Sequence, residues 1–310
     1  MQIIDDLTDF RFSAETVVTS GTFDGVHVGH QKILRSIAKE AQVNDMKSVV
    51  VTFWPHPRFV LKKNHDDLKL LSTFEEKAQL IEKNGIDYLI KIPFTKSFSE
   101  LSSEQFINDV IVDKINTKRL VIGYDHKFGK NREGGFDYLK ANASRYGFEV
   151  REIPRQDIED VGVSSTEIRK ALTDGDIRTA NEFLGRKYSL SGFVKEGDRI
   201  GRSIGFPTAN LDVPEFYKLI PRDGAYAVWV EFQNHMHMGM LNIGVRPTVS
   251  GEERRIEVNI FDFGKDIYNE RLTIHFHSLL RNEQRFESID ALKAQLQNDK
   301  LEAINILKDD

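Results

Sequence analysis

Two histidines in a glycine-rich segment are well suited to bind phosphate. The segment is GTFDGVHVGH, residues 21–30; it follows an apolar run, residues 17–20, and precedes a helical pattern over residues 33–41. Glycines let the backbone turn sharply and come close to a ligand, and the first N–H groups of a helix attract anions. On a first helical turn, His27 and His30 would lie near each other and donate to the same anion.

The spacing H-x-G-H favours nucleotide chemistry. The segment is neither the dinucleotide fingerprint G-x-G-x-x-G nor a Walker loop. It looks like the nucleotidylyltransferase signature, whose enzymes bind ATP and transfer its AMP group to an acceptor. The alternative is a surface turn with two incidental histidines, but strand, glycines and histidines coincide in the order that this chemistry needs. The other residues assigned to the nucleotide are Gly21, Phe23, Asp24, Gly25 and Gly29, with Asp24 holding either the loop or the ligand.

A second candidate anion site follows residue 163. Ser164 and Ser165 are expected to cap the N-terminus of a helix, with Thr166 beside them and Arg169 one turn further on. The alternative is a plain N-cap with a solvated arginine, and these residues alone favour that alternative. The phosphate site gains support because a triphosphate needs to be clamped from the side opposite the paired histidines.

A third candidate site is the segment GDRIGRSIGFPTAN, residues 197–210. Its glycines would form a flap whose N–H groups could wrap phosphates; they are Gly197, Gly201 and Gly205. Thr208 and Asn210 are two residues apart, so on an extended segment both face the same way. Their neutral oxygens suit Mg²⁺, which takes few protein ligands besides phosphate oxygens and water.

Glu257 is the candidate base of this third site. On the expected strand over residues 255–261, the aliphatic side chains Ile256, Val258 and Ile260 face one side and Glu257 faces the other. A carboxylate there can take the proton from an attacking hydroxyl. The alternative is an exposed strand glutamate, which the spacing alone favours.

Strands that alternate with helices must position the first two sites. Strands are expected over residues 48–53, 88–92, 119–123 and 148–151, and helices over residues 73–83 and 103–112. Thr73 and Glu76 have the spacing of a capping box. The alternation over residues 1–183 predicts a Rossmann-like α/β domain with a parallel sheet. Ligands bind beyond the carboxyl ends of such strands, where the loops of residues 54–58 and 124–132 follow.

From residue 184 the pattern changes to short strands and turns. Strands are expected over residues 225–230, 255–261 and 272–276, and a helix over residues 288–307. Strands spaced by about 10–15 residues with turn signals between them predict a small antiparallel barrel. We therefore expect two domains, residues 1–183 and 184–310, the second being a Greek-key β-barrel with a C-terminal helix.

Composition excludes several classes of protein. The 310 residues include no cysteine, which rules out disulfides, thiolate catalysis and cysteine-ligated zinc. The net charge of −5 argues against a general nucleic-acid binder. No apolar run approaches the ~20 residues that span a bilayer, and the first residues lack the plan of a signal peptide. A cytoplasmic enzyme fits these features.

Two histidine pairs could bind zinc. His235 and His237 share one strand face, as do His275 and His277. Exposed strand histidines are the favoured interpretation, because no carboxylate or cysteine set completes a zinc site.

The motifs resemble those of the bacterial bifunctional riboflavin kinase/FMN adenylyltransferases, also called FAD synthetases. The resemblance covers nearly the whole chain and rests on residues 21–30, 52–58, 123–132 and 164–169, then on residues 201–210, 242–248 and 261–268. Two different nucleotide-site signatures in the right halves make the match specific. The chain departs from the family at His126, Asn259 and Asn269, where phenylalanine, histidine and glycine are usual.

The resemblance implies two reactions that consume ATP and use Mg²⁺. Riboflavin is phosphorylated to FMN, and FMN is then adenylylated to FAD with release of pyrophosphate. The implied residues are His27, His30 and Arg169 for adenylyl transfer, Glu257 as kinase base, Thr208 and Asn210 for Mg²⁺, and Pro57, Arg58, Asp125, Arg281 and Glu283 for flavin. For Arg281 and Glu283, a solvated charge pair is the alternative. The implied partners are riboflavin, FMN and ATP, with no nucleic acid and no membrane; the chain is expected to be a monomer or weak homo-oligomer.

Three other functions stay open. A tRNA-charging enzyme can share the H-x-G-H turn, but the acidic charge and the lack of lysines in residues 164–166 argue against it. A non-catalytic flavin or RNA module built on the barrel would leave the first half without a role. A monofunctional member of the family, with one decayed site, is the third, although neither motif is visibly broken.

Overall fold

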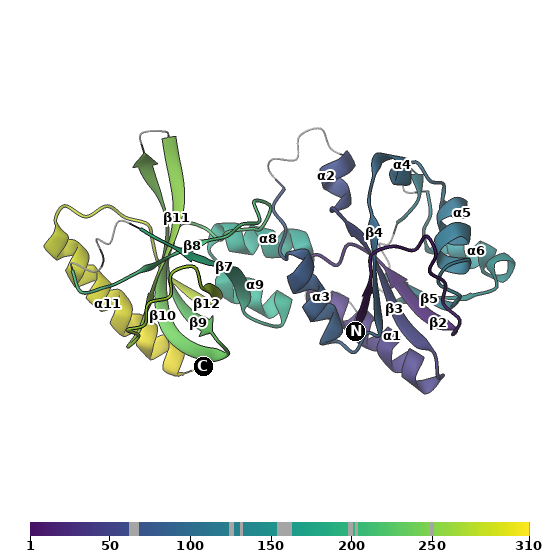
Figure 1. The fold of residues 1–310 in the computed structure, drawn as a ribbon, viewed down its shortest axis with the longest axis horizontal. Helices are drawn as coiled ribbons and strands as arrows, with labels where there is room; N and C mark the ends of the chain where they lie inside the picture. Colours follow the sequence, from purple (N-terminus) through teal and green to yellow (C-terminus); the bar gives the residue numbers. More distant parts are fainter. Residues whose placement is uncertain are drawn as a thin grey trace. The chain divides into compact units, whose positions relative to one another are not determined.

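The computed structural model divides the chain into two compact units, Met1–Ser165 and Thr166–Asp310 (Figure 1). It describes residues 1–61, 68–123, 127–130, 133–153, 163–197, 201, 204–248 and 251–309. The domain limits expected from the sequence, 1–183 and 184–310, stay a prediction.

The first unit is built on a six-stranded sheet in which every pairing is parallel. Its order is β1-β4-β3-β2-β5-β6, with β1 (Gln2–Ile4), β2 (Thr16–Ser20), β3 (Lys47–Trp54), β4 (Tyr88–Pro93), β5 (Thr117–Gly123) and β6 (Glu149–Ile153). The parallel sheet expected from the sequence is confirmed. Strand β1 was not expected, because only Ile4 of its three residues is buried and no alternation can be seen over so short a segment.

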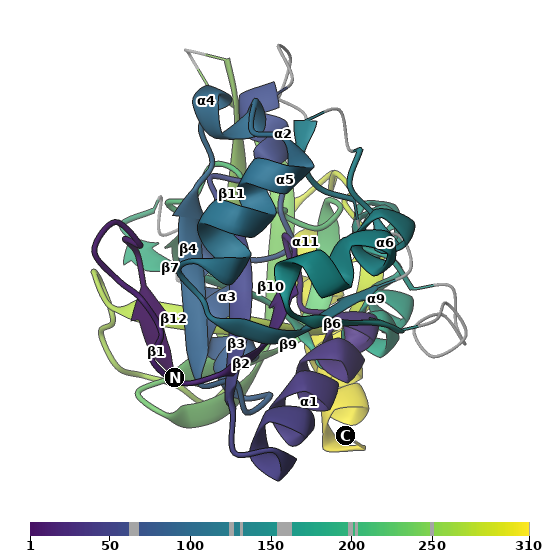
Figure 2. The same ribbon diagram turned by 90° about the vertical axis from the view of Figure 1, so that its right-hand side faces the viewer.

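Helices cover both faces of this sheet (Figure 2). They are α1 (Val28–Val43), α2 (Pro57–Leu61), α3 (Phe74–Glu82), α4 (Lys96–Ser99), α5 (Ser103–Phe106), the π-helical η1 (Ile107–Val112) and α6 (Phe136–Tyr146). The capping box is confirmed: Thr73 accepts from Glu76 N, and the Glu76 side chain accepts from Thr73 N. The helix expected over residues 103–112 is confirmed in its bounds, with α5 as its α-helical start and η1 as its π-helical end; apolar spacing does not distinguish a π-turn from an α-turn.

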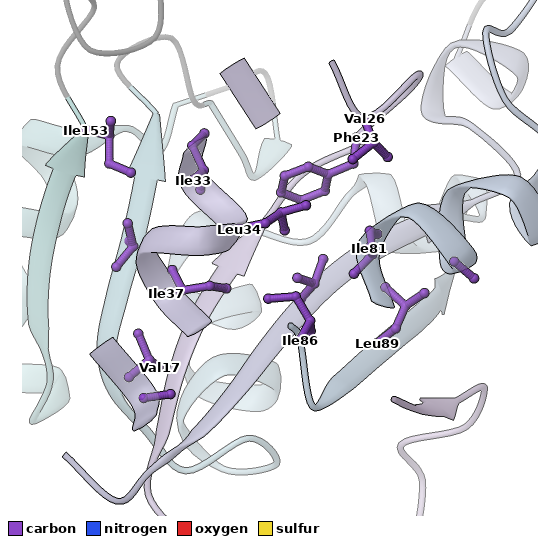
Figure 3. Packing of buried hydrophobic residues seen from close by; sticks show 14 of the residues in the cluster. Val17, Phe23, Val26, Ile33, Leu34, Ile37, Ile81, Ile86, Leu89 and Ile153 are labelled. Atoms are coloured by element: carbon purple, nitrogen blue, oxygen red, sulfur yellow. The ribbon is translucent and has the colours of Figure 1, made fainter. Parts of the chain in front are cut away.

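Two apolar cores lie on opposite faces of the sheet, because neighbouring strand residues point to opposite sides. Val17 and Val50 belong to one core, and Val18 and Val49 to the other. Figure 3 shows the first core, in which α1 and α3 meet the strands. Phe23, from the glycine-rich segment, is part of this core, so the segment is anchored to the centre of the unit.

The second unit contains a closed six-stranded barrel in which every pairing is antiparallel. Its order is β10-β11-β8-β7-β12-β9, with β7 (Tyr188–Lys195), β8 (Ala209–Asp212), β9 (Gly224–Phe232), β10 (His235–Thr248), β11 (Gly251–Ile260) and β12 (Arg271–Asn282). The helices are α8 (Ser165–Asp174), α9 (Ile177–Leu184) and α11 (Ile289–Lys308). The expected antiparallel barrel and C-terminal helix are confirmed, and Ser288 caps α11.

One expectation about the barrel is wrong. The last strand is expected over residues 272–276, which would leave Arg281 beyond it, but β12 continues to Asn282 along β9. Two shifts of register, after Phe276 and after Leu279, interrupt the alternation of side chains without ending the strand. The alternating pattern therefore stops earlier in the sequence than the strand does.

Candidate active sites

The paired histidines lie at the start of α1, directly after β2. His27 is the N-cap, and its Nδ1 accepts a hydrogen bond from the backbone N–H of His30 at 3.4 Å. The two rings are stacked, with centroids 3.7 Å apart and planes inclined by 21°. The expectation that these side chains lie near each other is confirmed, and both sit at the positive end of the helix.

The surroundings of His30 keep its imidazole neutral. Its Nδ1 is buried and has no hydrogen-bond partner within the described part of the chain. Burial, the neighbouring His27 and the charge of Lys77 hold the pKa of His30 well below its usual value of 6.5. A neutral imidazole has one N–H donor and one acceptor nitrogen, so His30 can donate to a phosphate oxygen without carrying a charge.

The turn that leads to the histidines has an unusual backbone. Phe23, Gly25 and Val26 have φ values of 47°, 80° and 40°, a region that costs energy for a β-branched residue such as Val26. Burial of Phe23 and Val26 in the core holds the turn in this conformation. Such strain is often found where a backbone must approach a ligand. A Cβ on Gly21 would lie 3.2 Å from the ring of Phe23, so a larger residue there would crowd that ring. Gly29 is buried in the first turn of α1.

Asp24 fastens the turn to the segment before α3. Its carboxylate is 2% exposed and accepts from the backbone N–H groups of Leu71 at 3.0 Å and Ser72 at 3.2 Å. The hydroxyl of Ser72 in turn accepts from Gly25 N at 3.1 Å. Of the two roles left open for Asp24, holding the loop is the one for which the structure shows hydrogen bonds.

The helix of the second expected anion site begins where the sequence predicted it. Ser165 is the first residue of α8, and its hydroxyl donates to the carbonyl oxygen of Asp24 at 2.9 Å. Ser164 precedes it and is partly buried. Thr166 and Arg169 follow on α8 and belong to the second unit, so their predicted contacts with a triphosphate stay a prediction.

The loop proposed to bind flavin follows β3. Pro57 and Arg58 open the short helix α2, and the backbone N–H of Arg58 donates to Nδ1 of the buried His56 at 3.2 Å. This places both residues at the carboxyl end of a central strand, as expected. Asp125 and His126 lie outside the described residues.

The other two departures from the family pattern fit their positions. Asn259 is buried and its Nδ2 donates to the carbonyl oxygen of Pro207 at 2.6 Å, which holds the segment ahead of Thr208. Asn269 has a φ of 63°. Asparagine tolerates this left-handed conformation better than most residues other than glycine, so the replacement is compatible with the turn.

Lys77 was not expected at the site. It lies on α3 with an exposed fraction of 1%, and its Nζ is 5.3 Å from the centroid of the Trp54 ring. Burial lowers its pKa from 10.5 to about 8, although the carboxylate of Asp24 acts in the opposite direction. One signal could have found it: the lysine occurs on the helix face otherwise formed by the buried Phe74, Ala78 and Ile81.

In the barrel, the predicted kinase residues line one cavity of about 260 Å³. Thr208, Asn210, Glu257, Arg281 and Glu283 all belong to it. Asn210 of β8 is directly opposite Glu257 of β11. Residues missed by the sequence analysis complete the wall, among them Asn242, Gly244, Phe286, Leu292, Leu296 and Asp299.

Glu257 faces this cavity while its neighbours on β11 face the core. Ile256 and Val258 are buried and Glu257 is partly buried, so the expected alternation is confirmed. Burial raises the pKa of Glu283 above its usual value of 4.5, and the charge of Glu257 acts in the same direction. The cavity therefore contains two carboxyl groups, and the charge of Glu257 favours the protonated form of Glu283.

The glycines of the expected flap have different environments. A Cβ on Gly197 would collide with the side-chain amide of Asn210, so glycine is needed there for close approach. A Cβ on Gly201 would collide with the carbonyl oxygen of Phe206, whereas Gly205 has open space and a φ of 89°. The intervening residues 198–200 and 202–203 lie outside the described part, and binding of phosphate by the flap stays a prediction.

Arg281 does not form the solvated pair with Glu283 that was the alternative to flavin binding. Its Nε and Nη2 donate to both oxygens of Asp299 at 2.9–3.1 Å. The Asp299 side chain is 2% exposed and that of Arg281 17%, and Gln295 Nε2 donates to Asp299 Oδ1 at 2.7 Å. This buried pair joins α11 to the cavity wall.

Replacing Asp299 by alanine should destabilise the second unit by about 3–5 kcal/mol, because it leaves the Arg281 charge without a partner. The measurement is urea unfolding followed by Trp229 fluorescence in a Trp54→Phe background, which restricts the signal to the second unit. The control is Asp174→Ala, which removes an exposed i,i+4 partner of Lys170 and should leave the midpoint unchanged. Equal midpoints for the Asp299 variant and its parent would contradict this assignment.

The histidine pairs of the barrel have partners of other kinds. His235 Nδ1 lies 2.9 Å from the carbonyl oxygen of Gln233, and His275 Nε2 lies 3.1 Å from Oε2 of Glu231. Among the described residues, no group of three histidine, cysteine, aspartate or glutamate side chains is arranged to hold a metal ion.

Family models match both halves of the chain. The model of FAD synthetase matches residues 10–167, and the model of riboflavin kinase matches residues 184–307. Three proteins named bifunctional riboflavin kinase/FMN adenylyltransferase are similar over most of their length. The one from Listeria monocytogenes is 38% identical over 94% of this chain and 92% of its own. Those from Escherichia coli K12 and Bacillus subtilis are each 36% identical, over 93% and 94% of this chain and 91% and 92% of theirs.

A solved structure has the same fold. It is that of a protein from Streptococcus pneumoniae described as a macrolide-efflux protein, which is 33% identical, covers 98% of each chain and has a TM-score of 0.89. Among the residues described for this chain, none of the helices has the length and apolar character needed to cross a membrane. The two family models and the full-length relatives agree, and the chain belongs to the family of bifunctional riboflavin kinase/FMN adenylyltransferases.

Proposed function

We propose that the chain makes FMN and FAD in two steps, one on each unit. The barrel transfers the γ-phosphate of ATP to riboflavin, and the α/β unit transfers the AMP group of ATP to FMN with release of pyrophosphate. The observation that carries the proposal is that each unit has its own arrangement suited to phosphate. These are the stacked His27–His30 pair at the start of α1 and the cavity wall formed by Thr208, Asn210 and Glu257.

The kinase step needs a base, because the ribityl hydroxyl of riboflavin is a weak nucleophile. We assign this role to Glu257, which faces the cavity. Its carboxylate accepts the hydroxyl proton as the oxygen attacks the γ-phosphorus and the bond to the β-phosphate oxygen breaks. Arg281 and Glu283 line the same cavity and are proposed to contact the flavin.

Thr208 and Asn210 have the chemistry to hold Mg²⁺. Both offer neutral oxygens, and the carboxylate of Glu257 is on the residue directly opposite Asn210. Mg²⁺ is bound in such sites through one or two protein groups, with phosphate oxygens and water completing the coordination. When bound, the ion offsets the negative charge of the phosphate oxygens in the transition state.

The adenylyl step needs alignment rather than a base, because the FMN phosphate is already anionic. Two anions must be brought together and the charge on the leaving pyrophosphate must be stabilised. We assign this to His27, His30 and the first N–H groups of α1, with Ser164, Ser165, Thr166 and Arg169 clamping the triphosphate. Pro57, Arg58 and Asp125 are proposed to contact the flavin. This role fits the donors and glycines of the site, among whose described residues no carboxylate–histidine pair is found.

The test is a product assay with the full chain, riboflavin, ATP and Mg²⁺, in which flavins are separated by chromatography over time. FMN is expected first and FAD afterwards. FMN alone would indicate a monofunctional kinase with an inactive α/β unit. Absence of both products, also with reduced flavin and with FMN as substrate, would refute the proposal. We propose a cytoplasmic enzyme that is a monomer or weak homo-oligomer and has no nucleic-acid partner.

A further inference from the structure

A buried lysine behind the paired histidines has no role in the two reactions as assigned above. Lys77 is 1% exposed and lies in the first turns of α3, where the helix dipole also disfavours a positive charge. Burying a lysine is costly unless a partner compensates its charge. Residues that carry such a cost are common at functional sites.

The packing of α3 places Lys77 on the side of the histidine turn. The buried face of α3 is formed by Phe74, Lys77, Ala78 and Ile81. Phe74, Ala78 and Ile81 share one apolar core with Phe23 and Val26 of the turn and with Ile33 and Leu34 of α1. Figure 3 shows Ile81 of α3 in this core together with Phe23, Val26 and Leu34. One helical turn before Ile81, Lys77 points into the same interface.

The charges around Lys77 agree with this placement. Among the titratable groups on the elements packed against α3, Asp24 of the turn and His30 of α1 interact electrostatically with Lys77, His27 stacks on His30, and Lys91 of β4 lies over the Phe74 ring. Asp24 raises the pKa of Lys77, and Lys77 lowers the pKa of His30, so the lysine is close enough to affect both ends of the turn. The Asp24 carboxylate is held by Leu71 N and Ser72 N.

We infer that Lys77 is a positioning residue of the adenylyl-transfer site: its ammonium, held behind the paired histidines by α3, supplies positive charge to the place where the ATP phosphates bind. The inference rests on the proposed function of the first unit. Lys77 acts through the field at the turn, because its own side chain is enclosed by protein. It strengthens binding of an anionic nucleotide as long as it keeps its proton.

The inference gives a pH dependence with a defined sign. A lysine is charged below its pKa, and burial brings the pKa of Lys77 to about 8. The kcat/KM for ATP reports groups of the free enzyme. It should therefore be high near pH 7 and fall as the pH rises through about 8.

The experiment measures FAD formation by the full chain from FMN and ATP between about pH 6.5 and 9.5, which isolates the adenylyl step. Lys77→Met, which keeps the length of the side chain and removes its charge, should lower kcat/KM for ATP at pH 7 by about 10- to 100-fold. Its pH profile should be flat through pH 8. Lys77→Arg keeps the charge and should move the decline above the measured range. Lys83→Met, on the exposed C-cap of α3, is the matched control and should behave as the parent.

Three results would overturn the inference. The first is a parent chain that makes FAD without an alkaline decline near pH 8, which needs no variant and holds even if a variant misfolds. The second is a Lys77→Met variant that is slower at every pH but keeps the decline, as expected if Lys77 only compensates Asp24. The third is a Lys77→Met variant with unchanged kcat/KM. Failure of the parent chain to make any FAD would instead refute the proposed function of the first unit.

Discussion

Replacing Glu257 by glutamine should lower the rate of FMN formation by about 10²–10⁴-fold, the range expected when a general base is lost. Glutamine keeps the size and polarity of the side chain, but its amide cannot accept the proton of the ribityl hydroxyl. Glu257 is positioned by β11, directly opposite Asn210 and Asn242 of the neighbouring strands, so the substitution should leave the cavity intact. The rate is measured by chromatography with riboflavin and ATP.

Two controls separate loss of the base from loss of the fold. Binding of riboflavin and of ATP by Glu257→Gln, followed by calorimetry, should match that of the parent chain. Glu231→Gln changes a carboxylate of the same barrel that is engaged with His275 and is not part of the cavity wall, so FMN formation should not change. A Glu257→Gln variant that phosphorylates riboflavin at the parent rate would show that another group accepts the proton.

The folds of the two units could be predicted because buried side chains recur at regular spacing along their strands and helices. In β11 the buried aliphatic side chains of Ile256 and Val258 alternate with that of Glu257, as expected of a strand in a closed barrel. In the first unit, Val17 and Val18 belong to different cores, as expected of a strand covered on both faces. Where the repeat is interrupted, as at the shifted end of β12, the prediction fails, and at η1 the spacing indicates a helix but not its π-turn.

The polar residues at the centre of each site could be predicted from local spacing, but the residues that hold them in place could not. His27 and His30 are three residues apart on one turn, so their proximity follows from helix geometry. The Arg281–Asp299 pair joins a strand to a helix, and no local pattern predicts which carboxylate Arg281 binds. Lys77 is a related case: its place on the apolar face of α3 is visible in the sequence, but the turn against which that face packs is not.

The charged groups of the two sites indicate how one chain can carry out two different reactions. The cavity proposed for the kinase step is lined by carboxylates, which suit a neutral hydroxyl, whereas the histidine turn has N–H donors and directs its own carboxylate, Asp24, to the backbone of Leu71 and Ser72. An unpaired carboxylate beside the histidines would repel both the triphosphate and the FMN phosphate. The different charge character of the two sites therefore matches their proposed nucleophiles, a neutral hydroxyl in the barrel and an anionic phosphate at the histidine turn.

Replacing His30 by alanine should abolish FAD formation from FMN and ATP, a loss of at least about 10²–10³-fold for one transition-state donor, and should leave FMN formation intact. His30 is suited to this role because it stacks on His27 and its pKa is held well below 6.5, so it remains a neutral donor at neutral pH. Both rates are measured on the same preparation, with FMN or riboflavin as the starting flavin. His235→Ala, which removes an exposed histidine of the barrel, is the control and should change neither rate.

The His30→Ala experiment also tests whether the two sites work independently. The stacked histidines belong to the first unit and the cavity of Glu257 to the second, and each unit has its own apolar core. A substitution that only removes a donor should therefore act on one reaction. If the variant keeps the circular dichroism of the parent chain but loses both activities, the sites cannot be independent, and the kinase step must require an intact histidine turn.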